Sequence, residues 1–348
     1  MRRPMQVHVN DVPRSRIAGI GAFLPATVVR SVDLEDGLRS AGLPVPAGFI
    51  ERATGIESHR AVSPGENASD LAVEAARQAL ARAEIASDDV DLLIFAAASH
   101  DVTEPATANI VQLKLGARRA VAFDVKNACN SFLSALDVAD GCVRLGRARV
   151  AVVTAGEAPS LCTDPRVRSR QELAARFAHF TMGDAGGAVV LTRADEPSRG
   201  ILASASITDG ASWALGTVLS FGTMYPRDLS PERALLRSDG CALESRARAE
   251  MPRVMTAALE AADWPPETVD VIACHQHTRR IAHELALAVG MRPECLALPL
   301  RYAGNAAAAN IPLALVDAAD DGRLVPGARV LLCGGSAGFS AIATAVSW

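Results

Sequence analysis

Residues 79–99 read ALARAEIASDDVDLLIFAAAS, and residues 258–277 read ALEAADWPPETVDVIACHQH. Each stretch is an Ala- and Leu-rich segment with helical spacing, an acidic turn and a short apolar run. A second pair of stretches, RARVAVVTAGEA from Arg147 and GARVLLCGGSAG from Gly327, recurs at nearly the same spacing of about 180 residues. Two independent matches at one spacing indicate an internal duplication.

The duplicated units predict an α/β fold. Apolar residues are spaced for a buried helix face over 68–83. The runs 92–97 and 150–154 show no polar alternation, which is typical of strands covered on both faces, so we expect a parallel-rich sheet with helices on either side. The halves are predicted at 1–195 and 196–348. Between about 159 and 180 the register of the copies is lost, which indicates an insertion near a binding entrance.

Composition narrows the class of protein. Hydrophobic residues make up 49% of the chain and charged residues 21%, which supports a large buried core. The net charge of −4 and the absence of a basic block argue against nucleic-acid binding. No apolar run is long enough for a membrane span, and the N-terminus lacks a signal-like apolar region. The seven scattered cysteines form no CxxC pair, so we expect no disulfide framework, no metal site and a cytoplasmic location.

One cysteine has the surroundings of a nucleophile. The stretch FDVKNACNSFLSALDVADGCVRLG, residues 123–146, reads as a strand end, a tight turn at 126–128 and a helix that stops near Gly146. We expect Cys129 in the first turn of that helix, where free N–H groups and the helix dipole favour the thiolate. This segment alone leaves an ordinary buried cysteine equally open.

Two segments of the second half supply possible partners. His275 and His277 follow the apolar run 271–274, at a strand end where α/β proteins place their chemistry. Because side chains alternate along an extended segment, the two histidines are expected to face opposite ways. Asn305 lies in the small-residue turn of RYAGNAAAANIPLAL, where an asparagine either caps a helix or donates to a substrate carbonyl.

Five motifs in order resemble one family over the whole chain. They are NACNSF at 127–132, GDAGGAVVL at 183–191, HQHTRRI at 275–281, GNAAAANIPLAL at 304–315 and GGSAGFSAIATAV at 334–346. The sequence thus resembles the thiolase superfamily, in particular its ketoacyl synthase III-like branch. The resemblance implies a thiolase-like five-layer αβαβα fold built from two duplicated halves, and a homodimer.

The resemblance also implies a Cys–His–Asn triad. Cys129 matches the acyl-accepting nucleophile, His275 the family histidine and Asn305 the family asparagine. The backbone N–H groups of Cys129 and Ala337 would form the oxyanion hole. His277 lies outside the motif and is expected to be structural or to line the tunnel.

A Claisen condensation follows from this triad. Cys129 attacks an acyl thioester, a second acyl or malonyl-type thioester supplies a carbanion, and a β-keto product leaves. His275 and Asn305 stabilise the enolate by hydrogen bonds to its carbonyl. Acyl-CoA or acyl-carrier-protein thioesters are the expected substrates and partners, and no cofactor is expected.

Two positions bear on the second substrate and the carrier. Glu104, 25 residues before Cys129, resembles the glutamate of olefin-forming and pyrone-forming ketosynthases, which acts as a base in the partner subunit's site; a solvated loop acid is the alternative. Arg280 is retained and would bind a carrier phosphate. The Trp and Arg of the starter synthases are replaced by Phe49 and Ala53, which favours a specialised polyketide or fatty-acid-derived pathway.

Two other functions stay open on sequence. The first is an acyltransferase of the same fold that moves the acyl group from Cys129 to a hydroxyl or an amine. Asn305 favours condensation over this transfer without excluding it. The second is a non-catalytic subunit of a heteromeric synthase. Such a subunit would lack the nucleophile or the histidine, and this sequence has both.

Overall fold

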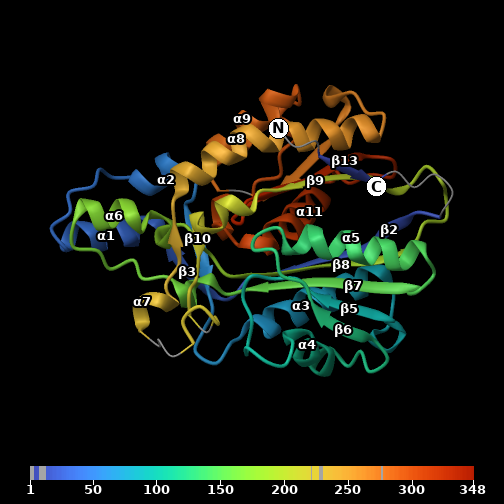
Figure 1. The fold of residues 1–348 in the computed structure, drawn as a ribbon, viewed down its shortest axis with the longest axis horizontal. Helices are drawn as coiled ribbons and strands as arrows, with labels where there is room; N and C mark the ends of the chain where they lie inside the picture. Colours follow the sequence, from blue (N-terminus) through green and yellow to red (C-terminus); the bar gives the residue numbers. More distant parts are fainter. Residues whose placement is uncertain (1–3, 8–12, 221, 227–229, 276) are drawn as a thin grey trace.

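Two five-stranded sheets and three helical layers alternate in the molecule (Figure 1). The computed structural model describes residues 4–7, 13–220, 222–226, 230–275 and 277–348. The first sheet has the order β2 (Ser15–Phe23), β8 (Ala185–Arg193), β7 (Val150–Glu157), β5 (Leu92–Phe95), β6 (Val121–Asp124). The second sheet has the order β1 (Met5–Val7), β9 (Gly200–Thr208), β14 (Ser340–Ser347), β13 (Arg329–Ser336), β12 (Val271–Cys274).

Three apolar clusters hold the five layers together. Helices α3 (Ala68–Ala83) and α4 (Thr107–Leu115) pack on the outer face of the first sheet. Helices α5 (Ser131–Arg144) and α11 (Asn310–Asp320) fill the space between the sheets, and α8 (Gly240–Ala261) and α9 (Arg279–Val289) cover the second sheet. The expected αβαβα fold is therefore confirmed, because each sheet buries both faces against helices.

The strand register shows the duplication directly. Leu92 of β5 pairs with Ala151 of β7, and Val271 of β12, 179 positions after Leu92, pairs with Val330 of β13. Both pairs are parallel. Helix α3 has the bounds that the apolar spacing predicts, 68–83.

The expectation of a parallel-rich sheet is wrong. Only β5 with β6, β5 with β7, and β12 with β13 are parallel in the two large sheets of the described chain, while the other pairs are antiparallel. Strand β8 is antiparallel to both neighbours, and its first seven residues are buried. Because helices cover both faces, antiparallel strands here are as apolar as parallel ones, so composition does not report strand direction.

The remaining elements surround the end of the sheets where the strands β5, β7, β12 and β13 finish. The stretch where the register is lost forms helix α6 (Arg170–Ala175) and two 3₁₀ turns, Pro159–Cys162 and Phe177–Phe180. It packs on α1 (Ser31–Ser40) and α2 (Phe49–Thr54). The short elements are β3 (Thr27–Arg30), β4 (Ser58–Ala61), β10 (Gly216–Thr217), α7 (Pro231–Ala234), β11 (Arg237–Ser238) and α10 (Leu300–Ala303). Within the described ranges, no helix is long and apolar enough to cross a membrane.

Candidate active site

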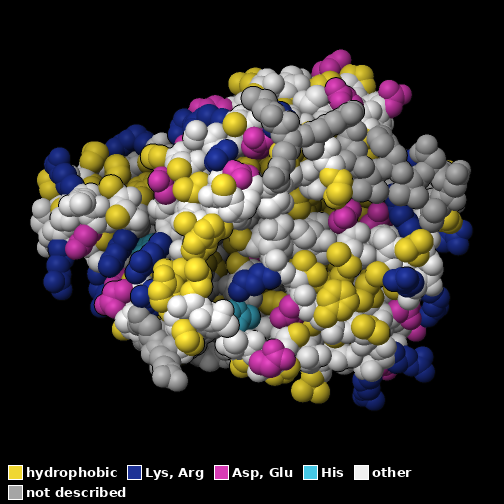
Figure 2. Space-filling model, viewed as in Figure 1, with side chains coloured by type: hydrophobic (Ala, Val, Ile, Leu, Met, Phe, Trp, Pro, Cys, Tyr) yellow, Lys and Arg dark blue, Asp and Glu magenta, His cyan; other side chains and the backbone are white. Residues whose placement is uncertain are grey.

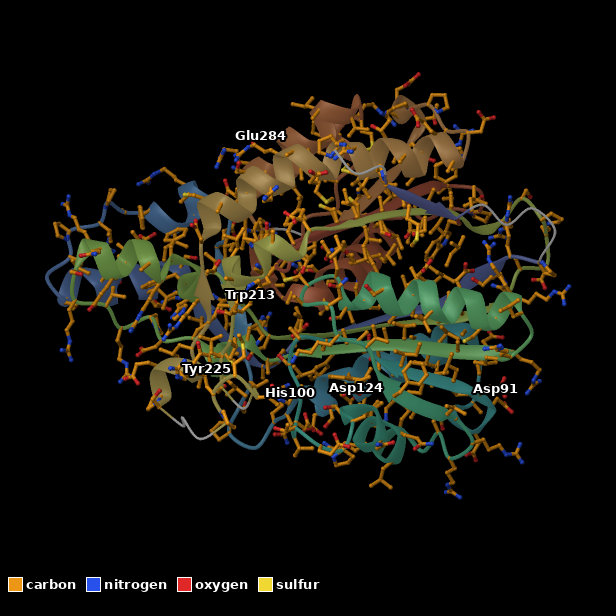
Figure 3. The ribbon with its side chains drawn as sticks, in the orientation of Figure 1. Asp91, His100, Asp124, Trp213, Tyr225 and Glu284 are labelled. Atoms are coloured by element: carbon orange, nitrogen blue, oxygen red, sulfur yellow. The ribbon has the colours of Figure 1, made fainter. Side chains whose placement is uncertain are left out.

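A cavity of about 1690 Å³ opens between the two halves. Its lining includes Cys129 from the first half and His275, Asn305 and Ala337 from the second. The structure thus brings the predicted triad and the predicted oxyanion-hole loop to one cavity. His100 and Trp213 also line it from the two halves, and Figure 3 labels His100 below Trp213. In the sequence, Cys129 and His275 are separated by 275 − 129 = 146 residues.

Two tight turns, here called elbows, present the site. Ala128 precedes Cys129 with φ = 47°, and Ala307, 179 positions later, has φ = 45°. Non-glycine residues rarely adopt this left-handed region, so the backbone of both elbows is strained. The surrounding packing holds it in this conformation. The first elbow leads into α5 and the second into α11. The duplication has therefore placed a strained turn at the start of each central helix.

Cys129 lies just ahead of its helix rather than in the first turn. Helix α5 begins at Ser131, two residues after Cys129, so Cys129 does not lie within the helix as expected. Burial, followed by the nearby Glu157 carboxyl group, raises the pKa of the Cys129 thiol to about 12, although a hydrogen bond with the Ser336 hydroxyl opposes the shift. The expectation of a dipole-stabilised thiolate is thus wrong, because desolvation of the buried thiolate outweighs the effect of the helix dipole.

The raised pKa of Cys129 gives a testable pH dependence. We expect its alkylation by iodoacetamide to accelerate about tenfold per pH unit between pH 7 and pH 9.5, because the thiolate fraction of a group with a pKa near 12 rises in that proportion. Peptide mass mapping would follow Cys129 beside the exposed Cys241 as an internal reference. A Glu157→Gln variant should react faster at every pH. A plateau in the rate near pH 8 would contradict the assignment.

His275 keeps one ring nitrogen free for the cavity. Its Nδ1 lies 3.0 Å from Asn310 Nδ2 and 3.2 Å from the Ala307 carbonyl oxygen, whereas Nε2 is buried with no partner among the described residues. Burial, followed by the nearby His277, lowers the pKa of His275 to about 3. The imidazole is therefore neutral at physiological pH, and Nε2 is available to a substrate.

The expectation that His277 faces away from His275 is wrong. The two ring centroids lie 5.8 Å apart at an interplanar angle of 68°, and both rings line the cavity. Strand β12 ends at Cys274, so the side-chain alternation of a strand does not continue to His277. Burial also lowers the pKa of His277, an effect that the charge of Glu244 opposes.

Two hydrogen bonds to its oxygen orient the Asn305 side chain. Oδ1 accepts hydrogen bonds from the Ala307 N–H at 3.0 Å and from Asn310 Nδ2 at 3.2 Å. The Nδ2 group of Asn305 donates to no other described residue, although the side chain is buried and lines the cavity. The amide thus presents its two hydrogens to a ligand. It does not cap a helix.

Two backbone N–H groups are also free. Those of Cys129 and Ala337 donate to no acceptor on another residue in the described ranges, and the Cys129 N–H interacts with its own thiol. The second elbow shows what such a group binds: the N–H of Ala308, equivalent to Cys129, donates to Glu157 Oε1 at 3.3 Å. A carboxyl oxygen accepts this N–H in the second copy, and in the first copy the equivalent N–H can donate to a substrate oxygen.

Two buried residues of the site were not predicted from the sequence. Glu157 ends β7, accepts hydrogen bonds from Ala98 and Ser99, and raises the pKa of Cys129. Its signal was an acidic residue at the end of an otherwise apolar strand. Asn310 begins α11 and contacts both His275 and Asn305. Its signal was a polar residue inside the apolar run AAAANIPLAL.

The remaining predicted residues lie at the margin. Arg280 lines the cavity mouth, where its guanidinium pairs with Glu284 at 3.0 Å and Glu244 at 3.2 Å; Glu284 is labelled in Figure 3. Glu104 is exposed on the loop between β5 and α4 and does not line the cavity of its own chain. No group of three or more His, Cys, Asp or Glu residues is placed to hold a metal ion in the described part of the chain.

Comparisons with known proteins agree with this geometry. Residues 123–210 match the family model of 3-oxoacyl-[acyl-carrier-protein] synthase III, and residues 259–348 match the model of its C-terminal part. The chain is 37% identical over 339 residues to the β-ketoacyl-[acyl-carrier-protein] synthase III of Rhodospirillum centenum, covering 96% of this chain and 99% of that protein.

Solved structures place the fold in the same group. The 3-oxoacyl-(acyl carrier protein) synthase III, FabH, of Pseudomonas aeruginosa matches with a TM-score of 0.86 at 27% identity, over 96% of this chain and 98% of that one. The priming β-ketosynthase of the R1128 polyketide pathway matches with a TM-score of 0.85 at 27% identity, over 98% of each. The chain belongs to the 3-oxoacyl-[acyl-carrier-protein] synthase III family of condensing enzymes, in the thiolase superfamily.

Proposed function

We propose that Cys129 carries the acyl group through a two-step condensation. In the first step its sulfur attacks the carbonyl carbon of an acyl thioester, and the carrier leaves as a thiol that takes up the Cys129 proton. The free N–H groups of Cys129 and Ala337 receive the oxyanion of the tetrahedral intermediate. The single observation that carries this step is the comparison of the two elbows. The Ala308 N–H of the second elbow donates to Glu157, whereas the equivalent Cys129 N–H of the first elbow has no acceptor on another described residue.

The second step uses the two free side-chain nitrogens. His275 Nε2 and Asn305 Nδ2 line the same cavity without partners among the described residues. Both donate to the thioester carbonyl of the second substrate while its α-carbon becomes a carbanion, either by loss of CO₂ from a malonyl-type thioester or by loss of a proton to a base. That carbon attacks the acyl carbonyl on Cys129, the C–S bond breaks, and a β-keto thioester leaves.

The substrates are thioesters of CoA or of an acyl-carrier protein. Apolar side chains dominate the deep lining of the cavity, which suits an acyl chain; they include Met251, Met255, Ile272, Leu285 and Phe339. Arg280 at the mouth is half-exposed and would exchange a carboxylate partner for a carrier phosphate. Phe49 and Ala53, at the positions where the starter synthases have Trp and Arg, support a specialised pathway over fatty-acid initiation.

A homodimer formed along β6 is part of the proposal. Strand β6 is an edge of the first sheet, and among the described strands it pairs with β5 alone. Val121 on this strand is 66% exposed, and Leu113 of the adjoining α4 is 82% exposed. Figure 2 shows apolar side chains gathered over α5 and β6 on this face. An unpaired apolar edge is a surface that proteins cover, and a second copy would continue the sheet across it.

Val121→Glu is expected to separate the dimer. A glutamate on each edge strand would bring two like charges together in a dry interface, which weakens association. Light scattering coupled to gel filtration should give a dimer for the wild type and a monomer for the variant. Leu287→Glu, at a residue of α9 that is 63% exposed and far from β6, is the matched control. A Val121→Glu dimer as stable as the wild type would contradict the interface.

The same edge supports a role for Glu104 in the partner's site. Asp124 at the end of β6 accepts hydrogen bonds from the Thr107 and Ala108 N–H groups, which ties the Glu104 loop to the edge strand. Figure 3 shows Asp124 beside His100, which lines the cavity. A carboxylate carried on this loop would remove an α-proton when the second substrate has no carboxylate to lose.

Glu104→Ala is therefore expected to lower condensation with an acyl extender about a hundredfold or more, because the proton acceptor is lost. Acyl loading on Cys129 should not change. The measurement is single-turnover product formation from preloaded enzyme, with Glu66→Ala as a control at another loop acid. Equal turnover of Glu104→Ala and wild type would remove Glu104 from the mechanism.

Product mass with paired donors tests the whole proposal. The enzyme would receive a ¹³C-labelled acyl-CoA with either malonyl-carrier protein or an unlabelled acyl-carrier protein as the second thioester. We expect a β-keto product that contains both acyl units, and CO₂ release only with malonyl. Release of the labelled acid alone with every pair would contradict condensation.

A further inference from the structure

Asn310, the first residue of α11, connects the two residues proposed for condensation. Its side chain is fully buried. Nδ2 lies 3.0 Å from His275 Nδ1 and 3.2 Å from Asn305 Oδ1, and Oδ1 accepts the Ala306 N–H at 3.0 Å. The reverse amide orientation would set two donors against each other at Ala306 and two oxygens against each other at Asn305. These contacts fix which atom of Asn310 is nitrogen.

The amide of Asn310 and the carbonyl of Ala307 make opposite demands on His275 Nδ1. A neutral imidazole carries one hydrogen, so Nδ1 either accepts from Asn310 or donates to Ala307. The Ala307 oxygen already accepts the backbone N–H of Asn310. If Nδ1 carried the hydrogen, one N–H of the buried amide would face it without an acceptor. Buried polar groups avoid this arrangement, so Nδ1 is the acceptor.

The hydrogen of His275 then resides on Nε2. That nitrogen is buried and has no partner among the described residues, and the ring lines the cavity. We propose that Asn310 is a positioning residue that fixes the Nε2–H tautomer of His275 and the rotation of the Asn305 amide, so that both donate to the substrate carbonyl. This inference rests on the proposed function, in which His275 is a donor in condensation.

The duplication supplies a natural comparison. Ser131 stands 179 positions before Asn310, at the start of α5. Its Oγ accepts the Asn127 N–H at 2.8 Å and donates to the Ala128 oxygen at 2.6 Å. A serine therefore completes the backbone of an elbow by itself. The amide of Asn310 satisfies the equivalent Ala306 N–H and adds the donor that reaches Nδ1.

Asn310→Ser is the variant that separates these roles. By the precedent of Ser131, it retains the elbow and removes the amide donor that contacts His275 Nδ1 and Asn305 Oδ1. We expect ¹⁵N NMR of the resting enzyme to show His275 protonated on Nε2 in the wild type and on Nδ1 in Asn310→Ser. The protein contains seven histidines, and the His275 signals are those missing from His275→Gln. Single-turnover condensation should fall about a hundredfold, as for loss of one oriented donor, with acyl loading unchanged.

Asn305→Ser is the matched control. It removes a donor to the substrate but not the contact with Nδ1, so condensation should fall while His275 stays protonated on Nε2. A His275 that remains Nε2-protonated in Asn310→Ser overturns the inference, whatever the turnover. A shifted tautomer with unchanged condensation overturns instead the donor role proposed for His275, so the two failures are distinguishable.

Discussion

Replacement of Cys129 by alanine is expected to abolish acyl loading and to lower condensation by at least about ten-thousandfold, as when a covalent nucleophile is removed. The variant keeps the strained elbow at Ala128 and the packing of α5, since alanine occupies the equivalent position 308 of the second elbow. Intact-mass measurement after mixing with acyl-CoA should show the acyl adduct in the wild type and none in Cys129→Ala.

Two controls sharpen the Cys129 result. Cys162→Ala removes another half-buried thiol that lines the cavity, and loading should persist in it. Cys129→Ser retains a hydroxyl of similar size but a much weaker nucleophile, and it should load slowly. An acyl adduct of normal yield in Cys129→Ala would show that a different residue carries the acyl group.

Removal of either donor is expected to stop condensation while sparing loading. His275→Ala and Asn305→Ala should each lower the condensation rate about a hundred- to a thousandfold, because each removes one oriented donor to the developing enolate. Loading uses the backbone N–H groups of Cys129 and Ala337, which neither change removes. Burst-phase release of the carrier thiol measures loading, and product formation from preloaded enzyme measures condensation.

His277→Ala is the matched control for the histidine. Its ring lies beside His275 in the same cavity, but it lies outside the family motif. It should change condensation far less than His275→Ala. A comparable loss in His277→Ala would shift the donor role from His275. Equal losses of loading and condensation in His275→Ala would assign that residue to the first step.

Local patterns predicted the parts of the fold that rest on burial. The helix at 68–83 was predicted within its bounds because one face of it is uniformly apolar. The duplication was visible because both copies keep the same acidic turn before the buried strand. Strand direction was not predictable, because β8 is buried on both faces whichever way it runs. The order of strands depends on pairings between residues distant in sequence, which no local pattern records.

The site divides in the same way. Cys129, His275 and Asn305 could be found from motifs, since each ends a recognisable segment. The raised pKa of Cys129 could not be predicted from the sequence, because it depends on burial and on Glu157, which lies at the end of another segment, strand β7. Asn310 was missed because its contacts with His275 and Asn305 exist only after the second elbow forms. Hydrogen bonds between side chains that are distant in sequence depend on the tertiary structure, so a local pattern does not predict them.

The most direct test of the account is a chase of the isolated acyl-enzyme. Wild-type protein loaded with a ¹³C-acyl group on Cys129 is freed of donor and then mixed with a malonyl-carrier protein. The acyl mass should leave the protein at the same rate as a β-keto thioester containing the ¹³C label appears on the carrier. Loss of the acyl group to water, or to an added alcohol or amine, without a new carbon–carbon bond would contradict condensation at Cys129.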